Sequence, residues 1–156
     1  MDTPVELFCN IHKISFKVIP EKHLFRGTGC PICSKSESYI ERIMRLELER
    51  NNIFYTKQKT FPWLIDKCKL KLDFYLDEYN IAIECQGSQH FIILKNDLYN
   101  KDETDLKKGQ NRDKLKHDLC EEHNIPILYF AKKKYVDNYE LGEVYTTTQQ
   151  IIEMIL

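Results

Sequence analysis

The sequence lacks any long apolar run. No stretch of its 156 residues approaches the roughly 18 consecutive apolar residues that a membrane-spanning helix requires, so we expect no membrane partner. The N-terminal segment MDTPVELFCN also lacks a basic region followed by an apolar stretch, which argues against a signal peptide. Repeats and low-complexity tracts are absent as well. We therefore expect an intracellular globular protein, in the cytoplasm or in a viral or host compartment that holds nucleic acid.

The chain has little net charge. The formal value of -1 predicts no partner by itself, but the charges are unevenly distributed. Residues 41–71 and residues 107–134 each contain eight Lys or Arg against four Asp or Glu, whereas residues 135–156 contain four acids and no Lys or Arg. The two basic segments indicate either a surface that binds a polyanion or the solvated faces of helices.

The periodicity of apolar residues predicts a mixed α/β core. Helical spacing predicts helices at residues 36–51, at 110–124 and over the last dozen residues. Alternating or continuous apolar residues predict strands at 54–61, 69–76, 81–86 and 125–130. Ser36 is the expected N-cap of the first helix, Leu115 and Leu119 are expected to face inward, and residues 94–108 are expected to form a polar loop.

Two of the predicted strands form a hairpin that brings two carboxylates together. The DEYN turn at residues 77–80 places Leu76 opposite Ile81, and the same register then places Asp73 opposite Glu84. Both acids point to one side of the sheet, and the other side is fully apolar. We therefore expect one face of the hairpin to form the core and the other to hold two carboxylates roughly 5 Å apart.

The facing carboxylates of Asp73 and Glu84 indicate a metal site. Like charges directly opposite each other are destabilising, and a bound divalent cation would cancel their repulsion and take both carboxylates as oxygen ligands. The alternative is a solvent-exposed pair that Lys69 or Lys71 neutralises.

Cysteine and histidine residues near the N-terminus have the spacing of a second metal site. Cys9-x-x-His12 is followed by Cys30-Pro-Ile-Cys33, and two ligand pairs with two-residue gaps are typical of a structural zinc site. His23 is an alternative ligand to His12. We therefore expect residues 1–35 to form a small zinc module.

The order of these segments resembles that of a known enzyme family. An aspartate in LDFYL, a glutamate about ten residues later in IECQGSQHF, the helix SKSESYIERIM before them and NRDKLKHDLCEEHNIPILYF after them resemble the PD-(D/E)XK nucleases of phages and large viruses. The resemblance covers roughly residues 34–131. His90 lies shortly after the predicted strand that carries Glu84, and in this the chain resembles the very-short-patch repair and related homing endonucleases, which carry a histidine at that place. The segment EKHLFRGTGCPIC resembles the zinc ribbons that accompany phage endonucleases.

The resemblance implies a fold, an activity and a set of residues. It implies a restriction-endonuclease-like mixed sheet flanked by helices over residues 36–156, preceded by the zinc ribbon at 1–35. It also implies a Mg²⁺-dependent DNA endonuclease that nicks or cuts double-stranded DNA, with a homodimer as one way to cut both strands. Asp73 and Glu84 match the metal-binding acids of the family, and Glu37 matches a glutamate that the first helix often contributes.

The chain departs from the family at the lysine of the motif, which Gln86 replaces. Lys71, Lys114 and Lys116 are the candidates for the missing cation, and we favour Lys116 because the pattern RDKLK places it on one helix face with Asp113. An ordinary ion pair between these two residues is the alternative.

Three further points follow from the resemblance. His90 is a candidate general base or phosphate ligand, or else a structural residue at a strand end. The candidate nucleic-acid contacts are Lys71, Arg112 and Lys114. The alternatives to a DNA endonuclease are an RNA-directed or structure-specific nuclease, and a binding protein that kept the fold but lost catalysis together with the lysine.

Overall fold

The computed structural model describes residues 3–10, 13–26, 29–32, 37–87, 90–91, 102–133 and 139–156, with only the backbone of residues 24–26. It divides into two compact units, Met1–Ile43 and Met44–Leu156, which we describe separately. The boundary falls inside helix α3 (Tyr39–Arg50), eight residues beyond the expected end of the zinc module at residue 35. None of the described helices is long and apolar enough to cross a membrane.

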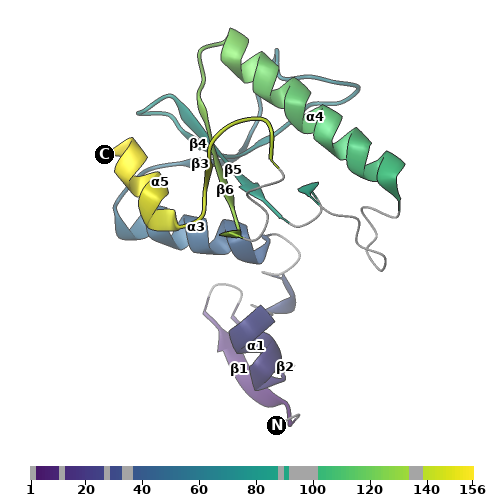
Figure 1. Ribbon diagram of the computed structural model, residues 1–156. Helices are drawn as coiled ribbons and strands as arrows, with labels where there is room; N and C mark the ends of the chain where they lie inside the picture. Colours follow the sequence, from purple (N-terminus) through teal and green to yellow (C-terminus); the bar gives the residue numbers. More distant parts are fainter. Residues whose placement is uncertain are drawn as a thin grey trace. The chain divides into compact units, whose positions relative to one another are not determined.

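The first unit is built on a small antiparallel hairpin followed by a short helix (Figure 1). Strand β1 (Val5–Cys9) pairs with β2 (Ile14–Val18), and α1 (Pro20–Arg26) follows. The turn between the strands closes through a hydrogen bond from the Lys13 N–H to the Cys9 carbonyl at 2.8 Å, with Lys13 in the left-handed region. Cys9, one of the predicted zinc ligands, therefore lies where β1 enters the turn.

The second unit contains a mixed five-stranded sheet. Its strands lie in the order β3-β4-β5-β6-β7, with bounds β3 (Thr56–Lys59), β4 (Leu72–Leu76), β5 (Ile81–Gln86), β6 (Ile127–Ala131) and β7 (Val144–Tyr145). Pairing is antiparallel from β3 to β5 and parallel from β5 to β7. The predicted α/β class with a mixed sheet flanked by helices is confirmed, whereas β7 was not predicted.

The predicted register of the β4–β5 hairpin is confirmed in the paired part of the strands. Leu76 lies opposite Ile81, and the next two pairs continue inward to Phe74 and Ile83. Asn80 ends the turn in the left-handed conformation that asparagine tolerates well, and its side chain donates to the Asn124 carbonyl at 3.0 Å. The turn thus fixes the alternation of the two strands and, with it, the side to which every side chain points.

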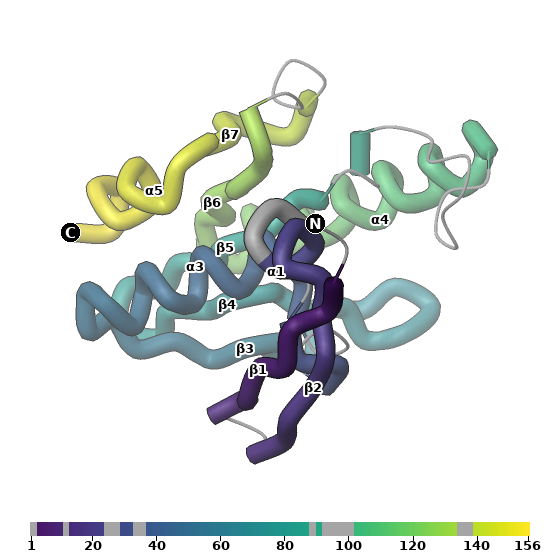
Figure 2. Tube along the Cα trace, turned by 90° about the horizontal axis from the view of Figure 1, so that it is seen from below, coloured from purple at the N-terminus to yellow at the C-terminus, as the bar shows by residue number. Residues whose placement is uncertain are grey.

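Helices cover both faces of the sheet. Figures 1 and 2 show α4 (Glu103–Glu122) on one face and, on the other, α5 (Thr148–Ile155) beside residues 44–50 of α3. The expectation that residues 94–108 form a loop is wrong for its last part, because α4 starts at Glu103 after an N-cap in which the Asp102 side chain accepts from the Asp105 N–H. The expected cap at Ser36 lies outside the described residues, and the Ser38 hydroxyl accepts from the Glu41 N–H instead.

The core has two layers, one on each side of the sheet. The α3/α5 side buries Phe74, Leu76 and Ile83 completely. The α4 side holds a second cluster, and its buried members are Leu64, Leu70, Leu72, Tyr75, Ala82, Cys120 and Ile125. Leu115 and Leu119 of α4 pack against this cluster, as predicted. The expectation of a single core face is therefore wrong: α4 covers the face that carries the carboxylates.

Candidate active site

The carboxylates of Asp73 and Glu84 meet where β4 and β5 separate. Beyond the pair of Phe74 and Ile83, side chains take over the hydrogen bonds between the strands. The Asp73 N–H donates to Glu84 Oε1 at 3.1 Å, and the Cys85 N–H donates to Asp73 Oδ2 at 2.9 Å. Each carboxylate therefore binds the backbone of the opposite strand, and the two acids lie together as the register predicts.

Glu84 is buried, and the pKa of its carboxyl is raised. Only 4% of the residue is exposed, and this burial, reinforced by the negative charge of Asp73, raises the pKa of its carboxyl from 4.5 to about 8. Lys116 opposes both effects, because its Nζ lies 2.7 Å from Glu84 Oε2. Burial works to lower the pKa of Lys116, but Glu84 outweighs it and the pKa of Lys116 is raised. Lys116 therefore places one positive charge beside the two acids, Asp73 and Glu84.

Of the three lysines that were candidates for the missing cation, Lys116 is the one that contacts the carboxylates. Lys114 is exposed and binds Asp118 of the same helix at 3.0 Å. The predicted partner of Lys116 was Asp113, but Lys116 projects onto Glu84. The alternative, an ion pair between Lys116 and Asp113 within the helix, is wrong. Lys116 pairs with Glu84, and Asp113 pairs with His90.

Lys71 is exposed and lies directly before β4, two residues ahead of Asp73. Lys69 and Lys71 are exposed, while Leu70 and Leu72 between and after them are buried. Glu84, in contrast, is buried and pairs with Lys116. Lys69 and Lys71 therefore do not neutralise a solvent-exposed acid pair, as the alternative had it, but precede the site along the chain. Arg112 is exposed on α4.

His90 is oriented by a buried acid that the sequence did not identify as a site residue. Its Nδ1 lies 2.6 Å from Oδ2 of Asp113, a residue of α4 that is only 9% exposed. The pair borders a pocket of about 230 Å³ that Lys107 and Lys114 also line. An acid three residues before Lys116 was the available signal, but helical spacing alone could not show that Asp113 faces a histidine.

Gln86 occupies the position of the motif lysine and is almost fully buried, with 2% of the residue exposed. Its Nε2 donates to the Tyr139 hydroxyl at 3.3 Å. Its Oε1 has no hydrogen-bond partner among the described residues. Tyr139 was not identified from the sequence, because it lies 53 residues away in a segment without periodicity.

The remaining predicted ligands lie in the first unit. The Glu37 side chain is nearly buried, and its carboxylate lies 3.9 Å from Arg42 Nε. Cys9 and Cys30 are buried, whereas the predicted ligands His12 and Cys33 lie outside the described residues. Among the side chains described in this unit, those classed as buried are Cys9, Val18, Cys30 and Ile40. Two of these four are thiols, so apolar packing contributes little to this unit.

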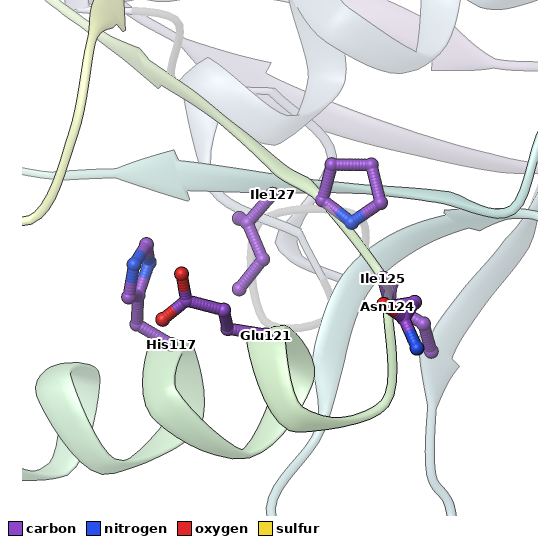
Figure 3. Close-up of a pocket in the computed structure, with 6 residues that line it drawn as sticks. His117, Glu121, Asn124, Ile125 and Ile127 are labelled. Carbon is purple, nitrogen blue, oxygen red and sulfur yellow. The ribbon is translucent and has the colours of Figure 1, made fainter.

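A second pocket lies at the other end of α4. It measures about 480 Å³, and its lining residues are His117, Glu121, Asn124, Ile125, Pro126 and Ile127. Figure 3 shows His117 and Glu121 side by side on the helix. His117 Nδ1 lies 2.8 Å from the Tyr129 hydroxyl, so this histidine joins the pocket to the face of the sheet that carries Glu84.

The oxygen donors around Glu84 suit a hard cation. The described residues contain no group of three or more His, Cys, Asp and Glu side chains that could hold a metal ion. Asp73 and Glu84 supply two carboxylates, and Mg²⁺ in proteins is often held by one or two carboxylates together with waters and phosphate oxygens. Burial and then the charge of Asp73 raise the pKa of Glu84, and a bound cation would counter both by favouring the ionised carboxylate.

Comparison with models of known protein families, with curated proteins and with solved structures gave no match to this chain.

Proposed function

We propose that the chain is a metal-dependent endonuclease of the PD-(D/E)XK type, with a restriction-endonuclease-like fold and an N-terminal zinc ribbon, and that it hydrolyses phosphodiester bonds in DNA. The observation that carries the proposal is the meeting of Asp73 and Glu84 from neighbouring strands with Lys116 from the helix that covers them. The sequence resemblance supports the choice of reaction.

Asp73 and Glu84 would hold the divalent cation, Mg²⁺ or Mn²⁺. Such an ion supplies charge stabilisation at the scissile phosphate and lowers the pKa of a bound water. Lys116 takes the place of the motif lysine: its Nζ lies against Glu84, where a cation stabilises the negative charge that develops on the phosphate. Because Lys116 comes from α4, Gln86 need not carry a charge.

His90 and Asp113 provide a base beside this site. A buried carboxylate at 2.6 Å from Nδ1 fixes the ring and stabilises the imidazolium that forms when Nε2 accepts a proton. Lys107 and Lys114 line the same pocket and would attract the phosphates of the substrate. His90 would accept the proton of the attacking water, and Asp113 would hold the ring in place.

The zinc ribbon would have a structural role. Cys9 lies at the hairpin turn and Cys30 is buried, so two ligands already belong to the interior of the first unit. A unit of this size rarely folds on apolar burial alone, and zinc held by Cys9, His12, Cys30 and Cys33 would supply the missing stability.

The decisive experiment is cleavage of supercoiled plasmid, short duplex DNA and duplex RNA by the purified chain in Mg²⁺, Mn²⁺ or EDTA. Asp73→Asn, Glu84→Gln and Lys116→Met should each lower the rate at least 100-fold. The control is Lys108→Met, which removes an exposed lysine of the same helix outside the His90 pocket. The ratio of nicked to linear plasmid tests for action as a dimer, since a monomer with one site nicks first.

Three results would contradict the proposal. Metal-independent cutting, or cutting that survives Asp73→Asn, would exclude the site. Tight binding of duplex without cutting under any metal would support instead a protein of this fold that binds nucleic acid without catalysis. Cutting of RNA in preference to DNA would change the substrate class and keep the site.

A further inference from the structure

The buried amide of Gln86 is the end of a chain of neighbouring polar side chains. Gln86 Nε2 donates to the Tyr139 hydroxyl at 3.3 Å, the Tyr139 and Tyr129 rings lie 5.0 Å apart between their centroids, and the Tyr129 hydroxyl lies 2.8 Å from His117 Nδ1. The chain crosses the face of the sheet under α4, from the candidate active site to the pocket in Figure 3. Buried hydroxyls are costly unless they are paired, so a purely structural core would favour Phe at both tyrosine positions.

The chain has a direction. Each hydroxyl donates one proton, so Tyr139, which accepts from Gln86 Nε2, keeps its own proton for a neighbour; donation to Tyr129 would leave the Tyr129 proton for His117 Nδ1. Burial is the main cause that raises the pKa of both tyrosines. The charge of Glu84 raises the pKa of Tyr129 further, and the charge of Tyr129 raises that of Tyr139.

This direction decides which atom Gln86 presents to the carboxylates. With Nε2 committed to Tyr139, the other atom of the amide is Oε1, which is buried and has no partner among the described residues. Gln86 lies two residues after Glu84 on β5, so both side chains project from the same face of the sheet. An unpaired buried acceptor on the face that also carries two carboxylates is a group that a cation, and not another acceptor, would satisfy.

We propose that Tyr139, Tyr129 and His117 hold the Gln86 amide with its carbonyl oxygen toward Asp73 and Glu84, where it serves as a third oxygen ligand of the divalent cation. The inference rests on the proposed function. It gives Gln86 a role that differs from that of the lysine it replaces: Gln86 contributes an oxygen to the ion, and Lys116 contributes the charge. Tyr139, Tyr129 and His117 are positioning residues, since they act through Gln86.

The test is the affinity for Mn²⁺ without nucleic acid, measured by calorimetry. Gln86→Ala removes the ligand and Tyr139→Phe removes its orientation, and each should weaken binding about tenfold or more, as expected for partners that orient metal ligands. Tyr129→Phe should act in the same direction but more weakly. The matched control is Tyr145→Phe, whose hydroxyl contacts Glu143 elsewhere in the same unit.

A second pair of variants tests the direction of the chain. His117→Lys offers Tyr129 only donors, so it should reverse the chain, turn the Gln86 NH₂ group toward the carboxylates and weaken Mn²⁺ binding. His117→Gln can still accept from Tyr129 and should bind nearly as the wild type does. Glu121→Gln is the control for charge. It makes the same pocket one unit more positive, as His117→Lys does for a neutral histidine, but it leaves the contact between His117 and Tyr129 in place.

A spectroscopic signature separates positioning from a general loss of structure. In ¹⁵N-labelled metal-free protein, the side-chain amide signal of Gln86 should shift in Tyr139→Phe and in Tyr129→Phe, and stay unchanged in Tyr145→Phe. Unchanged Mn²⁺ affinity in both chain variants, with binding still lost in Asp73→Asn, would overturn this inference and leave the proposed function standing. Absence of Mn²⁺ binding by the wild type would overturn both.

Discussion

The protonation of Glu84 predicts that the second unit loses stability as the pH rises. In the unfolded chain this carboxyl has a pKa near 4.5, and in the folded chain burial and the charge of Asp73 raise the pKa to about 8. Between these values the folded chain holds a proton that the unfolded chain has released. The free energy of unfolding must therefore be highest below about pH 4.5 as far as Glu84 is concerned, and fall until the pH passes about 8.

The magnitude follows from the two pKa values. A difference of about 3.5 corresponds to about 5 kcal/mol, at about 1.4 kcal/mol for each pH unit. This is comparable to the whole stability of many small domains. Lys116 adds no slope in this range, since it stays charged in both states. Glu84→Gln removes the titration, so its stability relative to the wild type should rise by about 3 kcal/mol between pH 5.5 and 7.5.

The assay is urea unfolding of both proteins at several pH values, without divalent metal. Trp63 is the single tryptophan of the chain and lies in the second unit, so its fluorescence reports the transition of that unit alone. The difference between wild type and Glu84→Gln cancels all other titrating groups. A difference that stays constant from pH 5.5 to 7.5 would refute the reasoning, because it would mean that Lys116 holds Glu84 ionised in the folded chain already at pH 5.5.

Four further outcomes are expected. Binding of Mn²⁺ at pH 7 should release about 0.9 proton per ion, because Glu84 starts mostly protonated and must ionise, and calorimetry in buffers of different ionisation enthalpy measures this number. Asp113→Asn should lower the cleavage rate and shift its pH profile, while leaving the affinity for duplex DNA in EDTA unchanged. Lys69→Gln and Lys71→Gln should each reduce the salt dependence of that affinity by about 0.9 in the logarithmic slope, if each lysine contacts one phosphate. The purified chain should contain one zinc per molecule, and Cys30→Ser should lose it without changing the Trp63 unfolding transition.

The hairpin was predictable because its information is local. A four-residue turn and a strict alternation of apolar residues fix which residues face each other, and both signals lie within 16 consecutive residues of the sequence, 69–84. The early start of α4 was missed for the opposite reason. Its first turns are largely exposed and lack apolar periodicity, so the remaining signal was the cap that Asp102 provides for the Asp105 N–H. An N-cap residue with an acid three positions later would have located that start.

The partners in the candidate site were less predictable, because they depend on the way α4 lies on the sheet. Spacing alone favours an ion pair between Asp113 and Lys116, since residues three apart share a helix face. The structure gives both of them other partners, Glu84 of β5 for Lys116 and His90 of the segment after β5 for Asp113. The low dielectric of the interior strengthens the contact of buried Glu84 with Lys116 at 2.7 Å.

The order of charges on α4 matches only one orientation of the helix. Along β5 and the segment after it, Glu84 comes before His90, whereas along α4 their partners Asp113 and Lys116 come in the reverse order. The helix therefore runs antiparallel to β5 over the site, as a connection between two parallel strands requires. With the helix direction reversed, Asp113 would face Glu84 and add a third acid to a pair that already repels. The sequence thus specifies the direction of α4 through its charges as well as through its apolar residues, although the pattern becomes readable only when the strand opposite is known.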